Sequence, residues 1–255
     1  MLEIDHIIPA ADSGEELKYI VSGDSISKGV VYDEDRSKYV ILEENYVSLL
    51  QDKVKGAVRN TARFGNTLMR GISSLKKDIS KDKPNIVLIE YGGNDCDFNW
   101  QEIAENPEAE HHPKTDFNLF ERMLTETIEY LRSQQITPIL MNLPPLNADN
   151  YFKWVSGSSS AAESNIMKWL GSVTKIYWWQ ERYSSTILKV SELTKTKMID
   201  VRSAFLAHPD FTKFLCVDGI HPNKDGHRII CDKVLEFLNN NYGHLLQPGM
   251  KEQLR

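Results

Sequence analysis

The chain has 255 residues, of which 41% are hydrophobic and 26% charged, a composition typical of a globular protein with a sizeable core. No apolar run approaches the roughly 20 residues that a membrane-spanning helix needs. The formal net charge of −6 also argues against a protein that binds nucleic-acid phosphates through a basic surface.

The N-terminal segment MLEIDHIIPAADSGEEL (1–17) lacks the features of a secretory signal. It carries acidic residues where such a signal has a basic patch followed by an apolar stretch. The sequence therefore predicts a cytoplasmic protein. Its three cysteines, Cys96, Cys216 and Cys231, form no CxxC pair and are too few for a disulfide framework, so we expect reduced thiols in or near a core.

Five short apolar segments are predicted to form buried parallel strands. Each is bounded by Gly, Pro or polar residues, as is typical of strands that are covered on both faces. They are LKYIVSG (17–23), the weaker KGAVRN (55–60), PNIVLIEYG (84–92), TPILMNLP (137–144) and TKMIDV (196–201).

Amphipathic segments with helical periodicity alternate with these strands. They cover residues 43–54, 67–80, 116–134, 165–195 and 224–241. The alternation predicts a single α/β domain over residues 1–255, a three-layer α/β/α sandwich whose five-stranded, mainly parallel sheet has a flavodoxin-like layout. Two insertions, 95–115 and 145–183, include connections longer than a compact domain requires, and we expect them to form a lid or to bind substrate.

Ser25 lies in the stretch VSGDSISKG (21–29), directly after the first predicted strand, where open α/β sheets bind ligands. Taken alone, this serine is more typical of a turn or a helix cap than of a catalytic residue. In VDGIHPNKDGH (217–227), Asp218 precedes His221 by three residues, so its carboxylate can lie beside the imidazole. Acyl transfer needs a hydroxyl, an imidazole that takes its proton and a carboxylate that orients the imidazole. These three side chains are candidates for those roles.

Two further segments supply hydrogen-bond donors at the same edge of the predicted sheet. Asn94 in YGGND (91–95) follows the third strand, and its amide can donate to the oxyanion of a tetrahedral intermediate. Gly65 in NTARFGNT (60–67) offers a backbone N–H with no side chain in the way. Both residues are also compatible with ordinary turns, so each signal is weak by itself.

Taken together, these segments resemble the sequence blocks of the SGNH hydrolases, also called the GDSL esterase/lipase family. The first block is GDS (23–25), the second contains Gly65, the third is GGND (92–95) and the last is DGIH (218–221). They extend over about 200 of the 255 residues, and a motif is more specific when its structural context agrees.

The resemblance implies a role for each of these residues. Ser25 would be the nucleophile, His221 the general base and acid, and Asp218 the carboxylate that orients the imidazole. The oxyanion hole would comprise the N–H groups of Ser25 and Gly65 and the side-chain amide of Asn94. The implied activity is a carboxylic ester hydrolase that uses no metal and no organic cofactor.

The natural substrate is a small-molecule ester whose identity the sequence leaves open. The family includes enzymes acting on lipid esters, acyl thioesters and acetylated sugars. Nothing in the sequence indicates a long apolar channel, which favours a short acyl group such as acetyl on a carbohydrate. If an alcohol reaches the acyl-enzyme before water does, the same residues make an acyltransferase.

Two alternative hypotheses involve no serine nucleophile. A non-catalytic flavodoxin-like module would bind an anion at the strand ends, although the sequence has no GxGxxG or Walker loop. A metal-dependent phosphodiesterase would need clustered His and Asp ligands. The adjacent His111 and His112 cannot readily share one metal, so we interpret them as solvated loop residues.

Four other residues near the predicted site are aromatic or acidic. Trp178 falls off the apolar stripe of its helical segment and Trp154 lies in the preceding insertion, so both are candidates for contact with substrate or with a second copy of the chain. A homo-oligomer is therefore among the expected assemblies.

Asp24 and Asp95 flank the predicted site, and we expect them to cap local structure rather than to act as acid or base.

Overall fold

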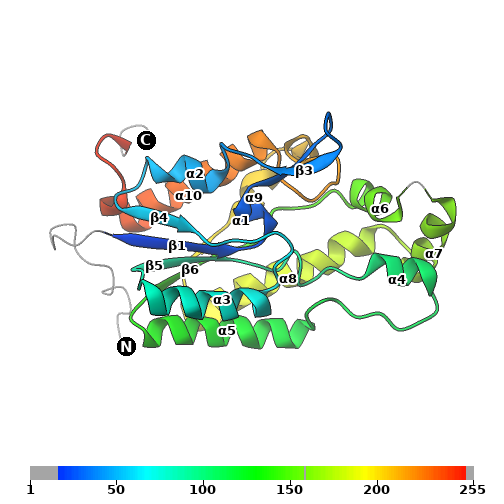
Figure 1. Ribbon diagram of the computed structural model, residues 1–255, viewed down its shortest axis with the longest axis horizontal. Coiled ribbons are helices and arrows are strands. Elements are labelled where there is room, and N and C mark those ends of the chain that lie inside the picture. Colours follow the sequence, from blue (N-terminus) through cyan, green and yellow to red (C-terminus); the bar gives the residue numbers. More distant parts are fainter. Residues whose placement is uncertain (1–16, 158, 251–255) are drawn as a thin grey trace.

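The computed structural model describes residues 17–157 and 159–250. Residues 1–16, which carry most of the signal for a cytoplasmic protein, lie outside the described residues. A parallel sheet with the order β4–β1–β5–β6–β7 forms the centre of the fold (Figure 1). Its strands are β1 (Lys18–Gly23), β4 (Ala57–Asn60), β5 (Ile86–Glu90), β6 (Thr137–Met141) and β7 (Met198–Ile199). This order, 2-1-3-4-5 when only these strands are numbered, confirms the flavodoxin-like layout.

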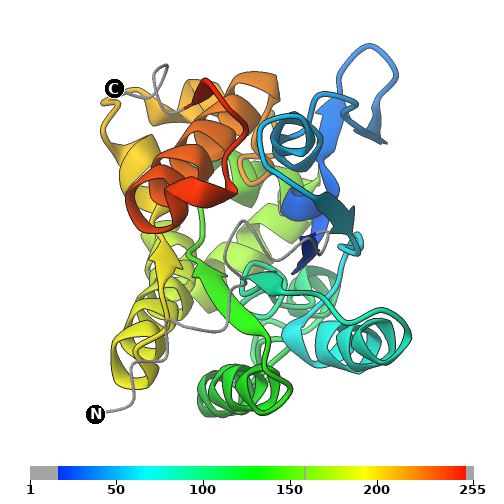
Figure 2. The ribbon, with the colours of Figure 1, turned by 90° about the vertical axis from the view of Figure 1, so that its left-hand side faces the viewer.

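Helices cover both faces of the sheet, as the alternation of strands and helices predicts (Figures 1 and 2). One face is covered by α2 (Tyr46–Gln51), α9 (Val201–Leu206) and α10 (Lys224–Tyr242), and the other by α3 (Leu68–Lys81), α5 (Phe117–Ser133) and α8 (Thr174–Thr194). Successive residues of a strand point to opposite faces. Tyr19 and Val21 of β1 therefore pack in the core with α2 and α10, whereas Ile20 packs in the core with α3 and α5.

A third hydrophobic core lies beyond the carboxyl ends of the strands, where the sequence predicts lid or substrate-binding insertions (Figure 1). Three helices, α4 (Trp100–Glu105), α6 (Ala148–Ser156) and α7 (Ser160–Leu170), form it with the start of α8. We call these three helices and the first turns of α8 the cap. The buried members of the third core are Phe98, Ile103, Leu146, Tyr151, Phe152, Ile166, Leu170 and Ile176.

The prediction of one continuous amphipathic segment over 165–195 is wrong. Helix α7 ends at Leu170, and Gly171 follows in the left-handed region with a φ of 73°. Its N–H donates to the carbonyl of Met167 (2.7 Å), which closes the helix, and α8 begins at Thr174. A glycine in this conformation at the end of a helix stops the helix at little cost.

A two-stranded hairpin, β2 (Val30–Asp33) and β3 (Lys38–Ile41), was not predicted from the sequence. It follows the short helix α1 (Ser25–Lys28) and brings Tyr39 close to the end of β1. The remaining short elements are the 3-10 helices η2 (Phe211–Phe214) and η3 (Gly243–Leu245). Within the described part of the chain, no helix is both long and apolar enough to cross a membrane.

His227 in α10 gives the stability of this fold a defined dependence on pH. Its ring is fully buried and stacks on Tyr46 of α2, whose backbone N–H donates to Nδ1 (3.4 Å). Burial, and after it the charge of His221, lowers the pKa of His227 from 6.5 to about 4. The unfolded chain therefore binds more protons than the folded one between these two pH values.

As pH falls from 6.5 to about 4, we expect His227 to lower the free energy of unfolding by about 3 kcal/mol. Urea unfolding of the wild type and of His227→Phe, at both ends of this range, measures the effect. The stability of the wild type should fall relative to that of the variant by this amount as the solution is acidified. A difference that stays constant with pH would contradict the assignment.

Candidate active site

The structure brings Ser25, Asp218 and His221 together at the carboxyl end of β1. Ser25 is the first residue of α1, directly after the strand. The Nε2 atom of His221 lies 2.9 Å from the Oγ atom of Ser25, and Nδ1 lies 2.6 Å from Oδ2 of Asp218. All three side chains are buried. An ionised carboxylate only accepts hydrogen bonds, so Nδ1 carries the proton and the lone pair of Nε2 faces the serine hydroxyl.

Local hydrogen bonds in the segment before α10 hold Asp218 and His221 in place. The Oδ1 atom of Asp218 accepts the backbone N–H groups of Ile220 (3.1 Å) and His221 (3.2 Å). Gly219, between them, lies against the start of α6, where a Cβ atom would come within 2.6 Å of the carbonyl oxygen of Asn147. Only glycine fits this close approach, and the backbone N–H of Asn147 donates to the carbonyl of Gly219 (2.8 Å).

Asp218 is held ionised by its surroundings. Burial alone would raise its pKa, but the hydrogen bond and charge of His221 and two backbone N–H groups outweigh burial and lower the pKa below its usual range. Tyr39 of the hairpin adds a donor, because its hydroxyl lies 3.0 Å from Oδ2. Burial, followed by the charge of Asp218, raises the pKa of Tyr39, so this hydroxyl keeps its proton. Sequence reasoning missed Tyr39 because no motif includes the hairpin.

The predicted oxyanion donors face the same cavity as Ser25. As the first residue of α1, Ser25 has a backbone N–H with no acceptor within its own helix. The N–H of Gly65 has no acceptor among the residues that the structure describes, and Gly65 lines the cavity. Asn94 donates one amide hydrogen to Oδ2 of Asp24 (3.2 Å), and no described residue accepts the second.

Asp24 and Asp95 have the local contacts expected of capping residues. Asp24 accepts the N–H of Ile26 through Oδ1 (2.9 Å) and thereby caps α1. Asp95 accepts the N–H of Leu68 at the start of α3 (3.0 Å) and the hydroxyl of Thr115 (2.6 Å). Burial raises the pKa of Asp95 to about 6 despite these hydrogen bonds.

Glu90, at the end of β5, is a second buried acid beside the site, and sequence reasoning missed it. Its Oε2 atom accepts the hydroxyl of Ser27 (2.8 Å) and lies 3.4 Å from the backbone N of Asp24. Burial and the neighbouring Asp24 carboxylate raise the pKa of Glu90 well above its usual range. Both effects favour the protonated form of Glu90. Its place in the apolar run IVLIE is a signal that could have identified it, because an acid there must be buried.

A cavity of about 1150 Å³ extends from Ser25 and His221 between the sheet and the cap. Trp154 and Trp178, the predicted substrate contacts, both line it. Trp154 packs edge-on against Tyr39, and Trp178 is 54% exposed, as its position off the apolar stripe predicts. Their contact with substrate or with a second copy of the chain stays a prediction.

His111 and His112 also line the cavity. The Nε2 atom of His111 lies 2.8 Å from the carbonyl oxygen of Asn106, and His112 pairs with the exposed Glu110. Among the described residues, no group of three or more His, Cys, Asp or Glu side chains is arranged to hold a metal ion.

Known proteins share both the sequence pattern and the fold. A family model described as GDSL-like lipase/acylhydrolase matches residues 21–229. The GDSL esterase/lipase WDL1 of Oryza sativa subsp. japonica is 22% identical over 174 residues, which are 66% of this chain. The match spans 60% of the length of that curated relative.

Solved structures with the same fold cover nearly the whole chain. The lipase/acylhydrolase from Enterococcus faecalis has a TM-score of 0.64 at 19% identity, covering 91% of this chain and 98% of its own. The acetylxylan esterase Axe2 from Geobacillus stearothermophilus, in a catalytic mutant form, has a TM-score of 0.58 at 20% identity, covering 89% and 94%. With the family model matching most of its length, the chain belongs to the GDSL-like lipase/acylhydrolase family.

Proposed function

We propose that the protein is a serine carboxylic ester hydrolase that acts through an acyl-enzyme intermediate. The observation that carries this proposal is the hydrogen-bonded series from Asp218 through His221 to Ser25, at distances of 2.6 and 2.9 Å. This series faces a cavity large enough for an organic substrate. A nucleophile, a base and a group that orients the base are the parts that acyl transfer requires.

Each atom in this geometry has a defined task in the proposed reaction. Nε2 of His221 takes the proton of Ser25 as Oγ attacks the ester carbonyl, and Asp218 stabilises the imidazolium. The oxyanion accepts hydrogen bonds from the N–H groups of Ser25 and Gly65 and from the second amide hydrogen of Asn94. The tetrahedral intermediate collapses when His221 protonates the leaving oxygen, and the alcohol departs. Water, activated by His221, then releases the acid and restores Ser25.

Asp24 acts in this scheme as a positioning residue. Its Oδ1 atom fixes the start of α1, and its Oδ2 atom holds the amide of Asn94. One carboxylate therefore sets the relative position of the nucleophile and of the side-chain oxyanion donor. Preorganised donors of this kind stabilise the oxyanion without the cost of reorientation during the reaction.

The size of the cavity supports a substrate with a substantial leaving group. Its volume of about 1150 Å³ exceeds that of a short acyl ester and lies slightly above the roughly 300 to 1000 Å³ typical of ligand sites in proteins. Aromatic side chains from the hairpin and the cap line it. We propose a short acyl group, such as acetyl, on a larger alcohol such as a carbohydrate, with a thioester as a further candidate.

Labelling with diethyl p-nitrophenyl phosphate tests the serine mechanism. Attack by Ser25 Oγ forms a bond to phosphorus and expels p-nitrophenolate, while His221 accepts the serine proton. We expect one equivalent of p-nitrophenolate for each protein molecule and one diethylphosphoryl group on the peptide that contains Ser25. Tandem mass spectrometry must place the group on Ser25 rather than on Ser22 or Ser27, which are engaged in hydrogen bonds with Tyr91 and Glu90.

No release of p-nitrophenolate, or modification of another residue, would contradict the proposal. If inorganic phosphate also raised the melting temperature of such an unreactive protein, a module that binds an anion without catalysis would replace the hydrolase.

A further inference from the structure

One face of helix α8 forms part of the cavity wall and carries two cations and two indoles. Lys175, Trp178, Trp179 and Arg182 have the spacing i, i+3, i+4 and i+7, so they share a single helix face. All four line the cavity that contains Ser25. None of the four takes part in the proton transfers or the oxyanion stabilisation proposed above.

Aromatic rings surround the charge of Arg182. The central carbon of its guanidinium group lies 4.3 Å from the ring centre of Phe117, 4.6 Å from that of Trp179 and 5.2 Å from that of Trp178. Such contacts attract the cation but supply no oxygen acceptor for its five N–H donors. Among the described residues, none forms a hydrogen bond or an ion pair with the side chain of Arg182 or Lys175.

The acidic side chains that line the cavity are already engaged elsewhere. Asp97 pairs with Lys114 (2.7 Å). Asp116 accepts two backbone N–H groups at the start of α5. Asp24 is buried and bound to α1 and Asn94. In a protein with a net charge of −6, the cavity charges that lack a partner among the described residues are therefore positive.

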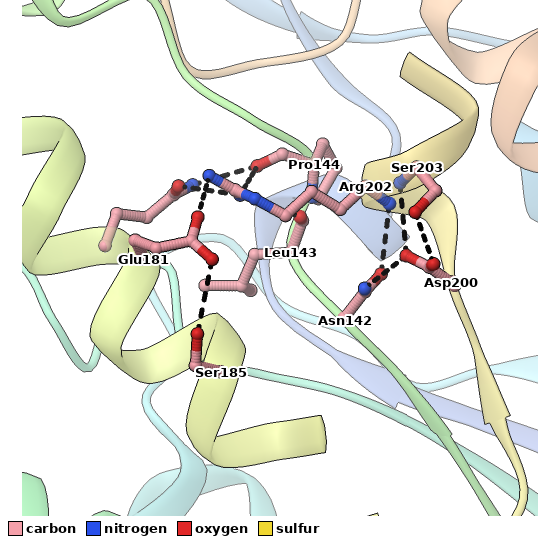
Figure 3. A network of polar contacts seen from close by, with 9 residues as sticks. Asn142, Leu143, Pro144, Glu181, Ser185, Asp200, Arg202 and Ser203 are labelled. Carbon is pink, nitrogen blue, oxygen red and sulfur yellow. Dashed lines mark hydrogen bonds and ion pairs between the residues drawn. The ribbon is translucent and has the colours of Figure 1, made fainter. Parts of the chain in front are cut away.

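The acid next to Arg182 in the sequence is engaged as well. Glu181 pairs with Arg202 (2.5 Å) and accepts the hydroxyl of Ser185 (3.2 Å), as Figure 3 shows. Arg202 also donates to Gln180 (3.0 Å) and to the carbonyl of Pro144 after β6 (3.4 Å). This network removes Glu181 as a partner for Arg182 and attaches α8 to the sheet, so the cavity face of α8 is held in position before a ligand binds.

We propose that the cavity face of α8 is a subsite for an oxyanion group, a carboxylate or a phosphate, that the ester substrate carries besides its scissile bond. The planar guanidinium of Arg182 matches either group with two parallel N–H donors. Lys175 adds a second positive charge, and the indoles offer faces for the apolar part of the ligand. The inference rests on the proposed function in that the same substrate is cleaved at Ser25.

Matched pairs of acetate esters test the subsite through the rate of hydrolysis. We would compare 4-acetoxybenzoate with 4-acetoxybenzamide, and 4′-acetoxybiphenyl-4-carboxylate with its amide, so that the charge is placed at two distances from the acetyl group. A third anion, 4-acetoxyphenyl phosphate, distinguishes phosphate from carboxylate recognition. In Arg182→Gln, the ratio of kcat/KM for the preferred anion to that for its neutral partner should fall about 10- to 100-fold, because a hydrogen-bonded charge is lost.

Two further variants separate a specific effect from a general effect of charge. Arg182→Lys keeps the positive charge but loses the two parallel N–H donors of the guanidinium. Its ratio of kcat/KM values, anion to neutral ester, should lie between those of the wild type and Arg182→Gln. Lys189→Gln removes a cation from the same helix outside the cavity, where Lys189 pairs with Glu121, and it should leave the ratio unchanged.

A binding experiment in Ser25→Ala tests the subsite without turnover. Tryptophan fluorescence should respond saturably to benzoate or phenyl phosphate, only weakly to benzamide, and the response to anions should be lost in Ser25→Ala/Arg182→Gln. The subsite is supported if the kcat/KM ratios or the fluorescence show a preference for anions and Arg182→Gln abolishes this preference. If the wild type hydrolyses the esters but neither experiment shows such a response, the subsite is overturned and the hydrolase stands. If no ester is hydrolysed, the proposed function fails while the binding experiment still decides the subsite.

Discussion

Replacing Ser25 by alanine is expected to lower kcat for p-nitrophenyl acetate by roughly 10⁵- to 10⁶-fold. The alanine has no oxygen opposite Nε2 of His221, so the acyl-enzyme cannot form, and only the oxyanion donors and substrate binding still assist the attack of water. Release of p-nitrophenol from the acetate, butyrate and octanoate, with and without EDTA, measures the effect. We expect the wild-type rates to be the same in EDTA.

A matched control for this substitution is Ser73→Ala on the exposed surface of α3, where the hydroxyl bonds only to the carbonyl of Met69 among the described residues. This variant should retain wild-type rates. The melting temperature of Ser25→Ala should remain close to that of the wild type, which separates loss of chemistry from loss of folding. More than about one hundredth of the wild-type rate in Ser25→Ala would exclude the serine as the nucleophile.

Asp218→Asn should lower kcat by about 10⁴-fold although it changes the shape of the side chain very little. Two backbone N–H groups donate to Oδ1, so the amide oxygen of the asparagine occupies that position. Its NH₂ group then faces Nδ1 of His221, which must accept a hydrogen bond. The imidazole proton consequently moves to Nε2, where it points at Ser25 and prevents His221 from taking the serine proton.

Tyr39→Phe is the control for Asp218→Asn, because it also removes a hydrogen bond to Oδ2 of Asp218 but leaves the carboxylate and the tautomer of His221 intact. Its loss in kcat should be below about tenfold, as expected for a single neutral donor. Both variants would be assayed with p-nitrophenyl acetate under the same conditions. Equal losses in the two variants would mean that Asp218 acts only through general packing of the site.

The sequence was sufficient to predict which residues line one cavity, because the topology places them at one edge of the sheet. Ser25, Gly65 and Asn94 follow β1, β4 and β5, three neighbouring strands of a parallel sheet. The carboxyl ends of such strands lie side by side, so residues distant in the sequence become neighbours. His221 joins them from the segment before α10, and its spacing from Asp218 is a local property of one turn.

Features that depend on packing between distant segments were not predictable in this way. Tyr39 reaches Asp218 only because the hairpin folds over the end of β1, and its strands are only four residues long. The burial of Glu90 follows from its place in the apolar run IVLIE, but its hydrogen bonds to Ser27 and to the backbone of Asp24 do not. The helical pattern of apolar residues continues across Gly171, so this pattern does not indicate that the helix ends there. In each case a tertiary contact or one backbone angle overrides a local pattern.

The third core gives the molecule a second interior besides the one around the sheet. Side chains in the cap pack mainly on one another, whereas those around β1 and β5 pack between the two helical layers. A substitution in the cap that reshapes the cavity therefore need not fit the interior that holds Ser25. Such an architecture allows the shape of the cavity to change without a change in the residues around Ser25. Trp179 packs against both interiors, so a substitution at this position is expected to affect both.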